Sequence, residues 1–124
     1  MKIFGHNFIE NRQFYFISKI EDIKKTSSNS VIFCDFNKEI IIYCKNQDVL
    51  FGVKVKNIKE LILSSASNAS YLLVDKNFSE VAQKIANEYM FDAKILLLSK
   101  NEDDIEFCAK NGIDGILFYE SKHK

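Results

Sequence analysis

Apolar residues along the chain fall into short runs that polar connections separate. Runs of this length, rich in β-branched and aromatic residues, are typical of strands buried on both faces. They recur about every 20 residues. The predicted strands are Phe14 to Ile17, Val31 to Asp35, Leu50 to Val55, Tyr71 to Asp75, Lys94 to Leu98 and Gly115 to Tyr119.

Between the later strands the apolar spacing changes to i, i+3, i+4, which predicts helices. These helices lie at Ile58 to Ser65, Phe78 to Tyr89 and Ile105 to Ala109. Three strands run into a similar sequence, in which an Asn is followed three residues later by an acid, the pattern of a helix N-cap. The predicted caps are Asn57, Asn77 and Asn101, and Ser18 to Glu21 has a similar spacing. Gly112 fits a left-handed C-cap.

The segment from Glu39 to Cys44 fits two structures. Its β-branched residues would pair with Val31 to Asp35 across a short turn as a hairpin. A buried helix instead keeps the strand-helix alternation, because the spacing between the flanking strands then matches the other units. We favour the helix.

This alternation predicts one α/β domain over residues 1–124, with a mostly parallel sheet of about six strands. The favoured arrangement is a three-layer, flavodoxin-like or Rossmann-like sandwich. The alternative is a half-barrel, in which sequential units place all helices on one side of the sheet. Residues 1–12 are expected to form an N-terminal arm, and residues 120–124 a C-terminal tail.

The charge balance and the lengths of the apolar runs limit which cellular compartment and which classes of binding partner we expect. Lys and Arg total 17 against 17 Asp and Glu, so no net field attracts nucleic acid or anionic lipid. No apolar run approaches the ~20 residues of a membrane-spanning helix, and no signal-peptide core is visible. We therefore expect a cytoplasmic protein. Cys34, Cys44 and Cys108 lack C-x-x-C spacing and should be buried, reduced thiols.

Candidate ligand-binding residues follow the strands, because open α/β sheets bind ligands at their carboxyl edge. The residues predicted there are Asp35, Asp75, Lys76, Ser99 and Lys100. No metal cluster, catalytic set or glycine-rich phosphate loop is evident, so no cofactor is predicted. His6 and His123 lie near opposite ends of the chain and are expected to be exposed to solvent.

Two partial resemblances accompany these patterns. The segment 93–118, with its G-x-D-G turn before the last strand, resembles the late units of (βα)8-barrel proteins. Some members of that group bind phosphate after the final strand, but Phe118-Tyr119-Glu120-Ser121 replaces the Gly-rich loop here. The order of Asp35, Asp75, Ser99 and Lys122 resembles response-regulator receiver domains, which implies a phosphoacceptor role for Asp75.

Function is open at this point. A non-enzymatic interaction or regulatory module, acting through a protein partner or as a homodimer, best fits the missing catalytic motifs and the abundant apolar residues. The alternative is a small anion-binding protein or enzyme that uses the carboxyl edge of the sheet.

Overall fold

The structure, a computed structural model, describes residues 1–9 and 13–119. The strands are β1 (Lys2–Phe4), β2 (Phe14–Phe16), β3 (Val31–Asp35), β4 (Phe51–Lys54), β5 (Tyr71–Val74), β6 (Lys94–Ser99) and β7 (Gly115–Phe118). The helices are α1 (Ile20–Ile23), α2 (Lys38–Asn46), α3 (Ile58–Ala66), α4 (Lys76–Glu88) and α5 (Asp104–Asn111). None of the helices in these ranges is both long and apolar enough to cross a membrane.

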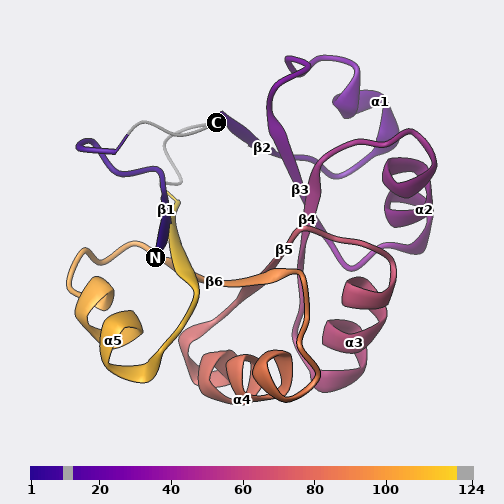
Figure 1. The fold of residues 1–124 in the computed structure, drawn as a ribbon. Helices are drawn as coiled ribbons and strands as arrows, with labels where there is room; N and C mark the ends of the chain where they lie inside the picture. The colour runs from indigo at the N-terminus through magenta and orange to yellow at the C-terminus, as the bar shows by residue number, and fades with distance from the viewer. Residues whose placement is uncertain (10–12, 120–124) are drawn as a thin grey trace.

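The strands form one parallel sheet in the order β1-β7-β6-β5-β4-β3-β2. The sheet curls, and the helices lie around its outer side (Figure 1). Consecutive neighbours joined by right-handed crossovers place their helices on the same side. The predicted α/β class is confirmed, and the curled sheet corresponds to the half-barrel alternative.

The number of strands, predicted as about six, is seven among the residues that the structure describes. The additional strand is β1, which pairs with β7 in the part of the chain predicted to be an arm. Gly5 follows β1 with φ +81°, and a Cβ on this residue would lie 2.5 Å from the Phe118 carbonyl oxygen. Glycine therefore permits the close approach of β1 to the end of β7. Residues 10–12 and the predicted tail lie outside the described residues.

Alternate residues of the strands enter two separate cores. The outer core, between sheet and helices, contains Ile32, Leu72 and Leu97. The inner core fills the concave side with the buried residues Phe4, Val31, Phe33, Leu73, Leu96 and Leu117. Gly52 also lies on the concave side, and a Cβ there would come within 2.5 Å of the Phe33 ring. The aromatic side chains thus occupy the space that a larger residue at position 52 would need.

The segment from Glu39 to Cys44 is helical, as favoured from the sequence, and lies within α2. Asn37 accepts a hydrogen bond from the Ile40 N–H and caps this helix. The apolar residues of the segment are divided between faces, with Ile40, Ile41 and Cys44 buried and Ile42 exposed. A helix satisfies their backbone groups locally and still buries most of this apolar surface.

The predicted caps have mixed outcomes. Asn57 accepts from the Glu60 N–H at 2.9 Å, and the Glu60 carboxylate accepts from the Lys56 N–H, so this capping prediction is confirmed. Gly112 adopts the predicted left-handed conformation, with φ +65°. Asn77 was predicted wrongly, because Asp75 occupies the N-cap position and α4 begins one residue before Asn77.

The other two caps are also corrected. Asn101 accepts from the Asp103 N–H two residues later and forms a turn ahead of α5, whose N-cap is Asp103. Ser18 precedes the N-cap Lys19 of α1, and its N–H donates to Asp22. The Asn101 side chain thus bonds within the turn before α5, which is the usual competition between turn and cap, whereas the partner of the Ser18 N–H is a residue of α1.

Candidate functional site

A row of charged residues lies where β3, β4 and β5 end. Asp35 follows Val31 and Phe33 at two-residue spacing, and both of these belong to the inner core. The same alternation places Lys54 on the concave side after Gly52, and Asp75 there after Leu73. Asp35 and Lys54 are neighbours in the β3–β4 register. Three adjacent strands thus direct charged side chains toward the carboxyl mouth of the curled sheet.

Within this mouth row, Lys54 is the only cation. Its Nζ lies 4.0 Å from Asp75 Oδ1, and the two side chains are 30% and 69% exposed. At that exposure water screens the pair, so its contribution to stability is small. The row therefore presents one ammonium group and two carboxylates that remain accessible to solvent.

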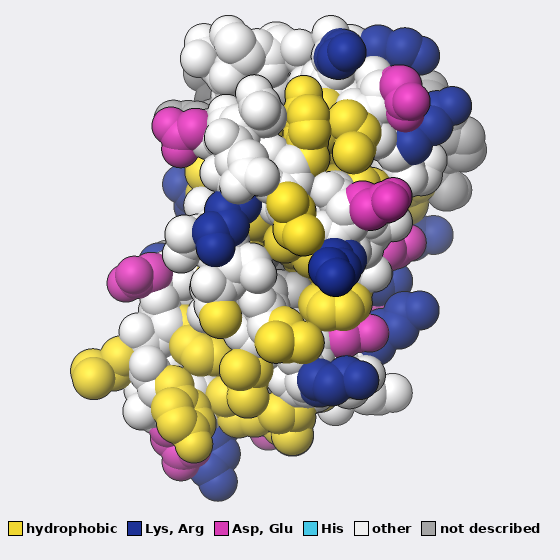
Figure 2. Space-filling view, turned by 90° about the vertical axis from the view of Figure 1, so that its right-hand side faces the viewer, with side chains coloured by type: hydrophobic (Ala, Val, Ile, Leu, Met, Phe, Trp, Pro, Cys, Tyr) yellow, Lys and Arg dark blue, Asp and Glu magenta, His cyan; other side chains and the backbone are white. Residues whose placement is uncertain are grey.

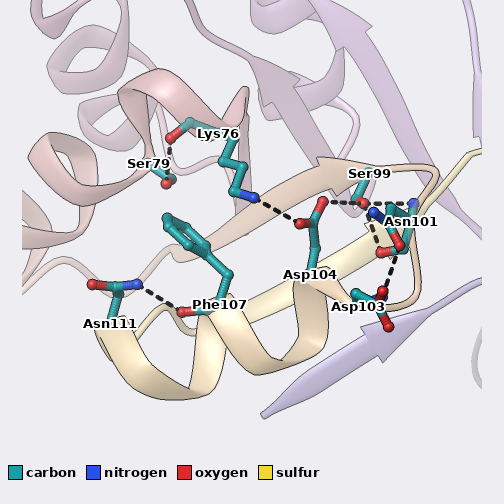
Figure 3. Close-up of polar contacts among 8 residues, drawn as sticks. All are labelled: Lys76, Ser79, Ser99, Asn101, Asp103, Asp104, Phe107 and Asn111. Atoms are coloured by element: carbon teal, nitrogen blue, oxygen red, sulfur yellow. Dashed lines mark hydrogen bonds and ion pairs between the residues drawn. The ribbon is translucent and has the colours of Figure 1, made fainter.

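A second polar cluster lies on the outer side of the same edge (Figure 3). Ser99 Oγ donates to Asp104 Oδ2 at 2.7 Å, and Lys76 Nζ donates to Asp104 Oδ1 at 3.0 Å. Ser99 Oγ also accepts from the Asn101 N–H at 2.9 Å. Lys76 Nζ lies 4.7 Å from the centre of the Phe107 ring, a distance that permits a cation–π contact.

These contacts change the ionisation of Asp104. The hydrogen bond from Ser99 and, after it, the hydrogen bond from Lys76 lower the pKa of the carboxyl below its ordinary value of 3.8. The Ser99, Lys76 and Asp104 side chains thus bond to one another. The Ser99–Asp104–Lys76 cluster links β6 to the first turns of α4 and α5.

His6 joins the same edge from β1. Its Nδ1 accepts a hydrogen bond from the Phe8 N–H, so Nε2 carries the proton that bonds Glu102. The ring packs against Phe118 at the end of β7. The side chain is only 17% exposed, so the expectation of a solvent-exposed His6 is wrong. The β1–β7 pairing, absent from the sequence prediction, brings it here.

The structure divides the predicted site residues into three locations. Asp35 and Asp75 lie in the mouth row, Lys76 and Ser99 lie in the outer cluster, and Lys100 is an exposed loop residue without an ion pair among residues 1–9 and 13–119. Sequence reasoning missed Lys54 and Asp104. The two-residue spacing from Gly52 was the signal for Lys54, whereas no spacing in the sequence indicated the contacts of Asp104 with Ser99 and Lys76. Lys122, from the receiver-like order, lies outside the described residues.

The cysteines are buried and free, as expected. Burial raises the pKa of Cys34 to about 12 and the pKa values of Cys44 and Cys108 to about 11. A thiol with so high a pKa is almost entirely protonated at neutral pH and is a poor nucleophile. Across residues 1–9 and 13–119, no three His, Cys, Asp or Glu side chains are grouped so that they could hold a metal ion.

Comparison with known proteins adds no assignment. No protein-family model matches the chain, and no curated protein matches it significantly.

Proposed function

We propose that this chain is a protein-interaction module that acts by self-association through the outer face of α3 and the adjoining surfaces of α2 and α4. The observation that carries the proposal is the composition of α3. Leu61 and Ser64 face the core, yet the outward side bears Ile58, Ile62 and Leu63, which are 45%, 43% and 48% exposed. A helix that is apolar on both sides is typical of a buried helix.

The neighbouring helices extend this surface. Ile42 on α2 and Val81 on α4 are also exposed, and α2, α3 and α4 follow one another around the outer side of the sheet (Figure 1). Figure 2 shows hydrophobic side chains gathered over the middle and lower part of one side of the molecule. Contiguous apolar patches of this kind mark interaction sites on monomeric proteins.

A second copy of the chain is the partner that the charges favour. Lysines and acids are interspersed around the hydrophobic area in Figure 2. The whole chain carries 17 residues of each sign, so two copies do not repel each other through net charge. A two-fold interface brings the same patch together from both sides and needs a surface that carries both signs. A partner of strongly biased charge would have no such complement here.

The experiment is the molar mass of the protein by sedimentation equilibrium. The wild-type chain should approach twice 14.4 kDa as concentration rises. Ile62→Lys should remain at the mass of one chain, because dimerisation would bury the new ammonium group in an apolar contact. Ile9→Lys is the matched control, since Ile9 is also 43% exposed but lies far from α3 in the sequence and follows β1. A wild-type mass of one chain up to about 1 mM would refute the proposal.

An anion-binding role at the carboxyl edge has less support. Lys54 lies beside Asp75 and in register with Asp35, so an anion in the mouth row meets two carboxylates for each ammonium group. Lys76 is already paired with Asp104. The charges at this edge therefore disfavour the ligand class that the alternative requires.

A further inference from the structure

A cavity of about 510 Å³ lies at the opposite, amino edge of the sheet. Its lining residues are Met1, Lys2, Tyr71, Lys94 and Asp114. Lys2, Tyr71 and Lys94 are the first residues of β1, β5 and β6, and Asp114 immediately precedes β7. The cavity is therefore the amino mouth of the curled sheet, and its size is within the range of small-molecule sites.

The side chains of three of these residues share the concave side. Lys2 alternates with Phe4, Tyr71 with Leu73, and Lys94 with Leu96. Phe4 and Leu96 are fully buried, and the Phe4 and Tyr71 rings pack edge to face with centroids 5.3 Å apart. The inner core thus begins two residues further along these strands, and the two exposed lysines lie at the open amino edge.

Gly115 permits the close approach of β1 to β7 beside these lysines. It is in register with Lys2 on one side and with Leu96, two residues after Lys94, on the other. A Cβ at position 115 would collide with the Lys2 carbonyl oxygen and lie 2.7 Å from Leu96 Cδ2 and 2.9 Å from Lys2 Cβ. Any larger residue here would displace β1 or the Leu96 side chain.

The side chains that line the cavity carry more positive than negative charge, with two lysines and one aspartate. Neither Lys2 nor Lys94 forms an ion pair with any residue in the described ranges. The one carboxylate, Asp114, uses Oδ2 to accept the Ile95 N–H at 3.0 Å. Two ammonium groups beside one open pocket attract an anion of two charges, and the Asp114 carboxylate can accept a hydrogen bond from a hydroxyl group.

We propose that the amino mouth binds a small phosphate monoester that also carries hydroxyl groups, with Lys2 and Lys94 holding the phosphate. The site is separate from the carboxyl edge and from the outer face of α3. It combines two exposed lysines that form no ion pair in the described ranges with one acceptor, and the Lys2 Nζ lies 5.8 Å from the centre of the Phe4 ring.

The test is a titration of the folded, ¹⁵N-labelled protein with glycerol 3-phosphate at low ionic strength. Backbone signals of Lys2, Lys94 and Gly115 should shift and saturate, whereas glycerol alone should leave them unchanged. Lys94→Gln should raise Kd about tenfold, the effect of losing one hydrogen bond to a charged group. Lys94 is exposed, so the Lys94→Gln variant should retain the fold, which circular dichroism verifies.

Lys100→Gln is the matched control, because it removes one exposed lysine from the other edge of the sheet. It should leave Kd unchanged. The proposal is overturned if about 10 mM glycerol 3-phosphate shifts no signal at the amino edge. It is also overturned if Lys100→Gln weakens binding as much as Lys94→Gln does.

Discussion

Phe4 and Phe14 pack edge to face with ring centroids 5.9 Å apart, although they lie on β1 and β2, the two ends of the strand order. The curl of the sheet brings its ends toward each other, and aromatic side chains span the gap. Phe33 meets both rings, at 6.2 Å from Phe4 and 6.0 Å from Phe14. The concave side is therefore closed by side-chain packing, where the described strands show no β1–β2 pairing.

Truncating Phe4 should be among the most destabilising changes. Phe4→Ala should lower the free energy of unfolding by about 3–5 kcal/mol, because this fully buried ring contacts three other aromatic rings. Urea denaturation measures the change. Phe8→Ala is the control and should cost no more than about 0.5 kcal/mol, since Phe8 is 88% exposed. Equal losses in the two variants would contradict the packing described for the inner core.

A methyl group at position 52 should strain the inner core. Gly52→Ala should cost about 1–3 kcal/mol, because the new Cβ lies 2.5 Å from Phe33 Cε1. The same substitution should cost less in a Phe33→Leu background, where the clashing ring is gone. A double-mutant cycle by urea denaturation measures this coupling. An identical cost in both backgrounds would show that the ring is not the obstacle.

The two asparagines near helix starts should respond differently to removal. Asn57→Ala should destabilise the protein by about 1 kcal/mol, since it removes the bond to the Glu60 N–H. Asn77→Ala should change stability by less than about 0.5 kcal/mol, because Asn77 is exposed within α4. Thermal unfolding of the two variants distinguishes an N-cap residue from a residue inside the helix. A larger loss of stability for Asn77→Ala than for Asn57→Ala would contradict the N-cap role given to Asn57.

Asp104 should make stability depend on pH. Its pKa in the folded protein is lowered, so the stability it contributes is present above its unfolded pKa and is lost as pH falls through the folded pKa. Asp104→Asn should therefore cost more at about pH 6 than at about pH 2, as measured by unfolding free energies across that range. Asp103→Asn is the control, because among the described residues Ser99 and Lys76 bond to Asp104 and not to Asp103, and its cost at about pH 6 should be the smaller of the two. A pH-independent loss of unfolding free energy in Asp104→Asn would contradict a stabilising role for the bonds from Ser99 and Lys76 to this carboxylate.

The central strands could be predicted from sequence because they are buried on both faces. Val31 to Asp35 was predicted with its observed bounds, and each of the other five predicted strands differs by one residue at one or both ends. β1 could not be predicted, since three residues are too few to show a period and their partner β7 lies at the far end of the chain. The missing strand also explains why His6 was placed in solvent.

The candidate site was predicted only in part. Its residues were chosen because they follow strands, without regard to the face of the sheet on which each side chain lies. Asp35 and Asp75 lie on the concave side, whereas Ser99 falls on the outer side with Leu97. The two-residue period alone was sufficient to separate them. The partners of Ser99 and Lys76 required the structure, since Asp104 meets both only after α4 and α5 pack beside β6.

The most direct test of self-association is a search for contacts between copies by methyl NMR. A mixture of copies with different isotope labels should give intermolecular NOEs between the Ile62 and Leu63 methyl groups of one copy and α3 of the other. The absence of intermolecular NOEs at about 0.5 mM, together with the relaxation rates of a single chain of 14.4 kDa, would contradict the account.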